Sequence, residues 1–251
     1  MNSNHKNTDT NAILITGSNG GIGGMILSYL LKNGHRNIIC QYRRSSDQIK
    51  KIFEIYAVDP TNRIFQADLN DEVSVQNMGI EIRKKHAFVS TIINVAGSSK
   101  NGMSWKITKN DFISVIHDNV LSAFLCSKEF IPDMREKNFG RIINFSSIVG
   151  HTGIAGASSY CAAKAALMGL TKSMSKELAS KKITVNAIAL GYFNAGLINE
   201  VSDDIKTEIK KNIPMQRFGD ENDIGSLIQY LIGQESNYIT GQIINLNGGQ
   251  I

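Results

Sequence analysis

A tyrosine and a lysine four residues apart, Tyr160 and Lys164, have the types and spacing needed for proton transfer. Residues i and i+4 share one face of a helix, so the ammonium would lie within reach of the phenol. A phenol has an ordinary pKa near ~10, and a neighbouring cation would lower that pKa toward neutrality. Such a pair could give a proton to a substrate or take one from it. Tyrosine and lysine at this spacing are more often an ordinary helix pair, so the rest of the chain must decide.

The elements that would position this pair form a regular alternation of apolar strands and amphipathic helices. The predicted strands are residues 12–16, 37–42, 63–67, 89–95, 140–147, 183–190 and 241–249. The predicted helices are residues 21–31, 46–57, 72–85, 111–137 and 157–179. Pro132 should bend or break the fourth of these helices near its end.

The predicted strands are apolar on both faces and most are followed by a helix, which indicates a parallel sheet covered on both sides. No linker or repeat interrupts the alternation. We therefore predict an α/β fold, a single Rossmann-type domain over residues 12–251 with a doubly wound, seven-stranded parallel sheet. Residues 1–11 have no apolar run and are predicted to be a disordered tail, not a signal peptide.

The composition is that of an ordinary globular protein, with 42% hydrophobic residues, 20% charged residues and a formal net charge of +5. Its basic residues are scattered, whereas a nucleic-acid-binding protein would show a dense basic stripe, so no nucleic-acid partner is expected. The cysteines and histidines lack the spacing of a disulfide framework or a metal site. Reduced thiols favour a cytoplasmic location. No apolar run reaches the roughly 18 residues of a membrane span.

A glycine-rich turn, "TGSNGGIGG" at residues 16–24, joins the first predicted strand to the first helix. Glycines would let the backbone approach a pyrophosphate whose charge lies at the helix N-terminus. Gly17, Gly21 and Gly23 follow the pattern T-G-x-x-x-G-x-G, not the commoner G-x-G-x-x-G. Such a turn alone could be a plain turn, but after the first strand of an α/β chain it predicts a dinucleotide site.

The second predicted strand ends in "QYRRSS", where NAD enzymes usually have an acidic residue for the adenosine ribose. Arg43 and Arg44 stand there instead, and a guanidinium matches a 2′-phosphate in geometry and charge. NADP(H) is therefore the expected cofactor, and a surface arginine pair is the alternative interpretation.

Eight motifs in register resemble those of the short-chain dehydrogenase/reductase family over nearly the whole chain. They are "TGSNGGIG" (16–23), "ADL" (67–69), "NVAG" (94–97), "DNV" (118–120), "GRIINFSSIVG" (140–150), "SSYCAAKAAL" (158–167), "ITVNAIALG" (183–191) and "NGG" (247–249). Within the family, the chain looks most similar to the 3-oxoacyl-[acyl-carrier-protein] reductases.

The resemblance implies a catalytic group of Asn119, Ser147, Tyr160 and Lys164, in which Ser147 is preferred over Ser146. The tyrosine would donate the proton, the serine would hold the carbonyl oxygen, and the asparagine would hold a water that serves the lysine. The implied cofactor-binding residues are Gly17, Ser18, Asn19, Gly21, Ile22, Gly23, Arg43, Arg44, Asp68, Leu69, Asn94, Ala96, Gly97, Tyr160, Lys164, Gly191 and Phe193.

Three positions depart from the family pattern. Gly20 stands where NADP-dependent members often have an arginine, Leu190 replaces the usual proline, and Ala195 replaces a threonine that commonly contacts the cofactor. These departures leave the chemistry intact and suggest a divergent member with weaker or redistributed cofactor contacts.

The resemblance thus implies an NADPH-dependent reductase of a carbonyl, with a 3-oxoacyl thioester as the first substrate class. The same chemistry on a sugar, polyketide or other small keto compound stays open, and a non-catalytic dinucleotide sensor is the remote alternative. An acyl carrier protein is a possible partner, and the basic residues that would meet it are Arg135, Lys137, Lys181 and Lys182. A homotetramer, paired through residues 108–137 and 157–180, is the family expectation.

Overall fold

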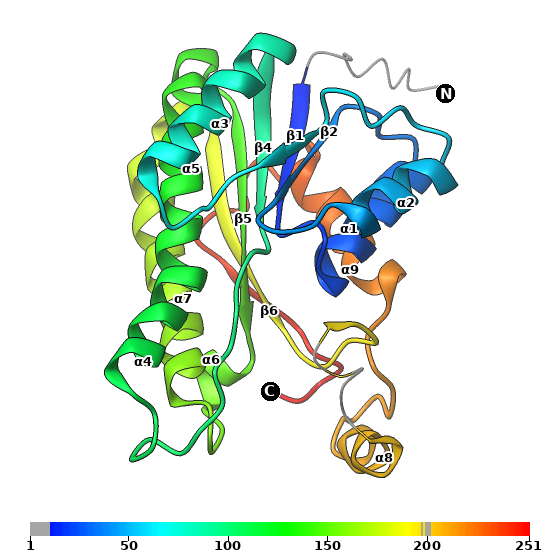
Figure 1. Cartoon of the computed structure of the whole chain (residues 1–251), viewed down its shortest axis with the longest axis vertical. Coiled ribbons are helices and arrows are strands. Elements are labelled where there is room, and N and C mark those ends of the chain that lie inside the picture. Colours follow the sequence, from blue (N-terminus) through cyan, green and yellow to red (C-terminus); the bar gives the residue numbers. More distant parts are fainter. Residues whose placement is uncertain (1–10, 197, 199–201) are drawn as a thin grey trace.

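The apolar segments of the chain form one sheet, as the computed structural model shows for residues 11–196, 198 and 202–251. Its order is β3-β2-β1-β4-β5-β6-β7 and its strand pairs are parallel (Figure 1). The strands are β1 (Asn11–Thr16), β2 (Ile38–Tyr42), β3 (Ile64–Gln66), β4 (Phe88–Asn94), β5 (Gly140–Ser147), β6 (Ile183–Leu190) and β7 (Ile243–Leu246). The predicted seven-stranded Rossmann sheet is confirmed.

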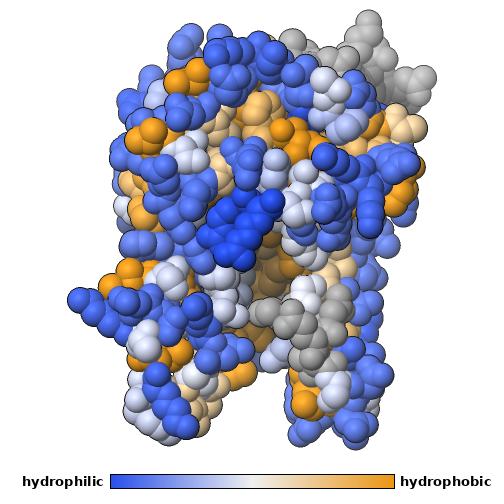
Figure 2. Space-filling model, viewed as in Figure 1, coloured by the Kyte–Doolittle hydropathy of each residue, from blue (hydrophilic) through white to orange (hydrophobic). Residues whose placement is uncertain are grey.

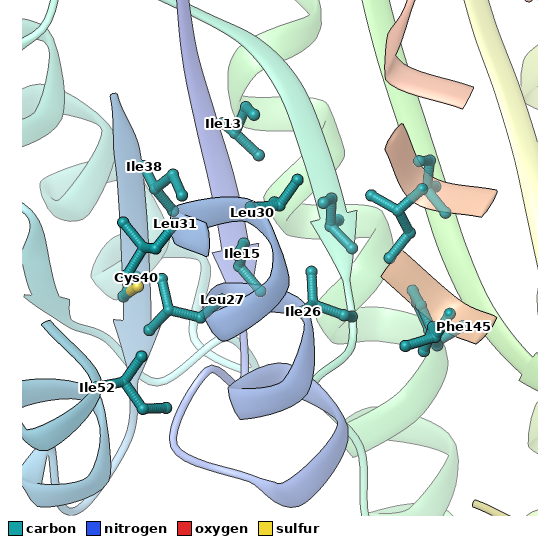
Figure 3. Close-up of a cluster of buried hydrophobic side chains, with 14 of the residues drawn as sticks. Ile13, Ile15, Ile26, Leu27, Leu30, Leu31, Ile38, Cys40, Ile52 and Phe145 are labelled. Carbon is teal, nitrogen blue, oxygen red and sulfur yellow. The ribbon is translucent and has the colours of Figure 1, made fainter. Parts of the chain in front are cut away.

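Two layers of helices cover the sheet because its central strands are apolar on both faces; β6 is buried at each of its eight positions. One layer contains α1 (Gly21–Lys32), α2 (Asp47–Ile55) and α9 (Glu221–Ile232). The other contains α3 (Glu72–Lys85), α5 (Ser122–Lys137) and α7 (Ser158–Leu178). In Figure 3, Ile26, Leu27 and Leu30 of α1 point at the sheet beside Ile15 and Phe145, as expected for a helix with one apolar stripe.

The predicted helix over residues 111–137 is divided at a place that differs from the prediction. It consists of α4 (Lys109–Ile116), a five-residue π-helical turn (His117–Leu121) and α5. Pro132 lies inside α5, which continues to Lys137, so the predicted break at that proline is wrong. The irregularity lies earlier, in the π-helical turn, which contains Asn119. Such turns are frequent at functional sites.

Two short helices lie at the carboxyl edge of the sheet, α6 (Val149–Thr152) and α8 (Asp203–Lys211). A 3₁₀ turn (Ala179–Lys181) follows the C-terminal end of α7. Asn11, predicted to end the tail, is the first residue of β1. The rest of the predicted tail, residues 1–10, lies outside the described residues. Within the described part of the chain, no helix is long and apolar enough to cross a bilayer.

Candidate active site

A cavity of about 1110 Å³ opens at the carboxyl ends of the strands. The strand order reverses between β1 and β4, and open α/β sheets bind their ligands at this kind of switch point. The surface is hollowed here between two projections, which carry α4 and α6 on one side and α8 on the other (Figures 1 and 2). Apolar surface lies inside the hollow (Figure 2).

The glycine loop (residues 16–24) forms one wall of the cavity. Gly17 has a φ of 63°, which side chains rarely allow, and a Cβ on it would lie 2.8 Å from the Ala96 Cα. A Cβ on Gly23 would lie 2.5 Å from the Gly17 carbonyl oxygen. Gln41 holds the loop, because its Oε1 accepts a hydrogen bond from the Gly17 N–H at 3.0 Å. The first turn of α1 then follows with no acidic residue, so its N–H groups can face an anion.

Tyr160 lines the cavity from the first turn of α7. Its pKa is raised to about 12, chiefly because burial disfavours the phenolate and also because of Cys161, while a hydrogen bond with Ser147 opposes the rise. The expectation of a lowered tyrosine pKa is therefore wrong for this structure. The phenol stays protonated at neutral pH, which is the form that can donate a proton.

Lys164 lies one helical turn after Tyr160 and is 5% exposed. Its Nζ donates a hydrogen bond to the Phe145 carbonyl at 2.7 Å and lies 5.3 Å from the centre of the Tyr160 ring. Burial lowers the pKa of the ammonium to about 8. The side chain is thus charged at neutral pH but close to losing its proton.

The two serines at the end of β5 have different surroundings. The Ser146 hydroxyl donates its hydrogen bond to the backbone carbonyl of Lys164 at 2.7 Å, so its single donor is already occupied. Ser147 lines the cavity; its Oγ makes long contacts of 3.4 Å with the Leu190 carbonyl and the Val149 N–H, and its side chain opposes the rise in the pKa of the Tyr160 phenol. The geometry therefore favours Ser147 as the serine that would meet a substrate.

Asn119 is 1% exposed and lies behind the cavity wall. Its Nδ2 donates to the carbonyls of Ser98 (2.7 Å) and Val115 (2.8 Å), which fixes the side chain in the π-turn. Its buried Oδ1 has no partner among the described residues. A Cβ on Gly97 would lie 2.4 Å from this Oδ1 and 3.7 Å from the Lys164 Nζ, so the oxygen and the lysine nitrogen are within about 6 Å of each other. An unpaired buried acceptor is costly, and a donor brought to this place would satisfy it.

A cluster of four polar side chains, the Asp118 cluster, lies near one end of the cavity. The Oδ1 of Asp118 accepts hydrogen bonds from Arg43 Nη1 (3.2 Å) and Asn70 Nδ2 (2.6 Å), and its Oδ2 accepts from Ser98 Oγ (2.6 Å). Burial alone would raise the pKa of this carboxyl, but its contacts with Ser98, Asn70 and Arg43 outweigh that effect and lower it. Asp118 is therefore a stable carboxylate.

Most residues predicted from the sequence are brought together at the cavity. Those that line it are Gly17, Gly21, Ile22, Gly23, Arg43, Asp68, Leu69, Ala96, Gly97, Ser147, Tyr160, Lys164, Gly191 and Phe193. Four predicted cofactor residues and Asn119 are not among the cavity-lining residues; the four are Ser18, Asn19, Arg44 and Asn94.

Three of these four residues support the loops around the cavity instead. Ser18 Oγ donates to the Ile15 carbonyl at 2.6 Å, and Asn19 Oδ1 accepts from Gln48 N at 3.0 Å at the start of α2. Asn94 is 3% exposed, and its Nδ2 donates to residues of α5 and β5. Arg44 is exposed to solvent.

Sequence reasoning missed several residues that organise the site. Gln41 is 2% exposed in an otherwise apolar strand, and a buried amide in such a strand is a usable signal. Thr16 accepts hydrogen bonds from the N–H groups of Val95 and Ala96, both at 3.1 Å. Nothing local distinguishes Asp118 and Ser98, which meet only in the folded chain.

The other end of the cavity is largely apolar. Its lining includes Met103, Ile154, Tyr192, Ile198 and Ile209. Across the described residues, no three His, Cys, Asp or Glu side chains are grouped to hold a metal ion.

The chain is similar to known proteins over almost its whole length. A sequence model of the family described as short chain dehydrogenase matches residues 11–206. The chain is 35% identical to a Staphylococcus epidermidis protein named 3-oxoacyl-[acyl-carrier-protein] reductase FabG, covering 94% of this chain and 97% of the relative. It is 34% identical to the Staphylococcus aureus protein of that name, covering 96% and 98%. It is also 34% identical to Nodulation protein G of Azospirillum brasilense, covering 94% and 96%.

Proposed function

Because the chain belongs to the short chain dehydrogenase family, we propose that it is an NADP(H)-dependent reductase that converts a carbonyl to an alcohol. The observation behind the proposal is that Ser147, Tyr160 and Lys164 share one cavity with a glycine loop and an anion-ready helix N-terminus. A non-catalytic dinucleotide sensor is disfavoured because it would not need these three side chains together.

The cavity fits a dinucleotide at its glycine-loop side. A Cβ at Gly17 would collide with the Ala96 backbone and one at Gly23 with the backbone of the loop itself, so the tight turn before α1 requires glycine at both positions, and the α1 N-terminus would hold the pyrophosphate. Asp68 and Leu69 would hold the adenine, and Arg43 would hold a 2′-phosphate. Leu190 and Gly191 line the same wall, so proline is not required there for a cavity to form.

The bound nicotinamide would supply the hydride, and the protein would supply position and a proton. Tyr160 would donate its phenol proton to the carbonyl oxygen as negative charge builds on it. Ser147, which lines the same cavity as the phenol, would hold that oxygen in place. The charge of Lys164 would stabilise the phenolate that is left, because the ammonium lies beside the ring.

Asn119 would complete the proton path. Its Oδ1 is buried, has no partner among the described residues and lies near the Lys164 ammonium. After Tyr160 has given its proton to the substrate, Lys164 would pass a proton to the phenolate, and a water held between this oxygen and Lys164 would return a proton to the lysine.

A 3-oxoacyl thioester is the proposed substrate class because the substrate end of the cavity is apolar. Met103, Ile154 and Ile209 offer surface for an acyl chain and no hydrogen bonds for a sugar. The names of the Staphylococcus relatives point to the same class. Reduction of a polyketide or another small keto compound is the second candidate, which the same apolar lining would accept.

An acyl carrier protein is proposed as the partner, with one constraint from the fold. The basic group (Arg135, Lys137, Lys181 and Lys182) is exposed but lies at the C-terminal ends of α5 and α7. Tyr160 is at the other end of the 21-residue α7, about 30 Å away. The basic group could therefore serve only the cavity of a second copy, packed antiparallel in the proposed oligomer. We place this reaction in the cytoplasm.

The test is NADPH oxidation with acetoacetyl thioester and with keto sugars as substrates. Tyr160→Phe is the mechanistic variant, and Tyr230→Phe, which changes an exposed tyrosine of α9, is its control. We expect turnover of the thioester, a loss of about 10²–10⁴-fold in Tyr160→Phe and none in Tyr230→Phe. Full activity of Tyr160→Phe would refute the mechanism. Turnover of sugars alone would refute the acyl substrate and leave the reductase class standing.

A further inference from the structure

Asp118 joins four parts of the chain that are far apart in the sequence. It lies in the π-turn and accepts hydrogen bonds from Arg43 after β2, Asn70 before α3 and Ser98 after β4. The Asp118 side chain is 18% exposed, whereas that of Arg43 is 44% exposed. A partly buried carboxylate held by three donors is thus the fixed member of the Arg43–Asp118 pair, and the arginine is the member that it restrains.

The contact with Asp118 uses only part of the guanidinium. Nη1 of Arg43 donates to Asp118. Within the described residues, no side-chain partner is recorded for the Nε and Nη2 donors of Arg43. The backbone of Arg43 is also held, since its carbonyl accepts from Gln66 Nε2 at 3.0 Å. A guanidinium fixed at one nitrogen can still present two donors to a phosphate.

The cluster is also connected to the catalytic group. Ser98 donates its hydroxyl to Asp118 and accepts the Asn119 side chain on its carbonyl. Asp118 and Asn119 are neighbours in the π-turn, so a substitution of one can shift the backbone that positions the other.

We infer that Asp118 is a positioning residue that restrains Arg43 for recognition of the 2′-phosphate of a nicotinamide dinucleotide. This inference rests on the proposed function and identifies which part of the site sets the cofactor preference. A long arginine side chain costs up to about 2 kcal/mol of rotamer entropy when a ligand must fix it. Restraining it in advance lowers that cost, and the three donors around Asp118 offset the repulsion between its carboxylate and a phosphate.

The probes are adenosine 2′,5′-bisphosphate and 5′-AMP, which differ by the 2′-phosphate and need no catalysis. Isothermal titration calorimetry would give the ratio of their dissociation constants for the full chain and for Asp118→Asn, which keeps the shape and removes the charge. We expect this preference for the 2′-phosphate to fall about fivefold or more in Asp118→Asn. Asp133→Asn is the control, because it breaks a similar surface pair with Arg83 (2.8 Å) on the α3–α5 side.

Two further variants make each outcome decisive. Asp118→Glu keeps the charge but moves the carboxylate, and it should also lose part of the preference if position matters. An unchanged or increased preference in Asp118→Asn, or in Asp118→Glu if the first variant does not fold, would overturn the inference. Arg43→Ala tests the premise separately: if that variant keeps the full preference, the proposed NADP(H) site is wrong, whatever Asp118 does.

Discussion

The two ends of the cavity, at which we propose catalysis (the catalytic end) and adenosine binding (the adenosine end), are held together in different ways. At the catalytic end, Lys164 and Asn119 are 5% and 1% exposed, and their nitrogens donate to backbone carbonyls of other elements. At the adenosine end, Arg43 and Asn70 reach a side chain, Asp118, and the arginine is 44% exposed.

This difference bears on how the two ends can change. The Phe145 carbonyl that holds Lys164 belongs to β5 and cannot move without the sheet, so the position of this lysine depends on the fold itself. A contact between two side chains is lost or remade by a single substitution, and an exposed ion pair contributes only about 0–1 kcal/mol. We therefore expect substitutions at the catalytic end to abolish turnover and those at the adenosine end to shift cofactor preference.

The largest effect is expected for a substitution of Lys164, at the catalytic end of the cavity. Lys164→Met should lower kcat/KM for thioester reduction about 10²–10⁴-fold, because the phenolate left on Tyr160 loses its cation. Lys172→Met, on the exposed face of the same helix, should keep full activity. Steady-state kinetics with NADPH measures both, and a loss below tenfold in Lys164→Met would contradict the proposed role.

The pH dependence of reduction also tests whether the charge of Lys164 supports Tyr160. The pKa of Lys164 is lowered to about 8 by burial, so the ammonium is charged below that pH and neutral above it. The rate of reduction should be level at neutral pH and fall about tenfold per unit above pH ~8, since the proton donor Tyr160 then lacks its cation. A kcat/KM profile from pH 6 to 10 measures this, with Cys161→Ser expected to show the same break. A profile that is level to pH 10 would be inconsistent with Lys164 as the titrating group.

The smallest effect is expected at Asn70. Asn70→Ala removes one hydrogen bond to Asp118 (2.6 Å) and also a buried Oδ1 that has no partner among the described residues. The dissociation constant of NADP⁺ should rise about fivefold, the value of one net hydrogen bond of about 1 kcal/mol, and kcat should stay unchanged. Fluorescence titration and steady-state kinetics test this, with Asn33→Ala as a remote control whose amide donates to Tyr29. A large loss of kcat would contradict this prediction and show that the link through Ser98 and Asn119 carries the change to the catalytic group.

The predicted helix over residues 111–137 shows where sequence reasoning failed. Its periodicity indicated one helix that Pro132 would bend or break near its end, yet the irregular turn is at His117–Leu121 and α5 continues through the proline. The π-turn is held by Asn119 donating to Ser98, a residue outside that helix, so no local pattern could reveal it. The prediction of a lowered pKa for Tyr160 failed for a similar reason. Burial raises this pKa to about 12, and burial is a property of the packed chain.

The amino-acid sequence by itself determined the family, the seven-stranded sheet and the Tyr160–Lys164 pair, because these depend on local spacing and on strand and helix periods. Only the tertiary structure decided which of two adjacent arginines enters the cavity and which of two adjacent serines meets Tyr160. Ser146 and Ser147 are successive residues of β5, so their side chains point to opposite faces. Arg43 and Arg44 follow β2, and Arg43 is placed by its contacts with Asp118 and Gln66, which come from segments that meet it only after folding.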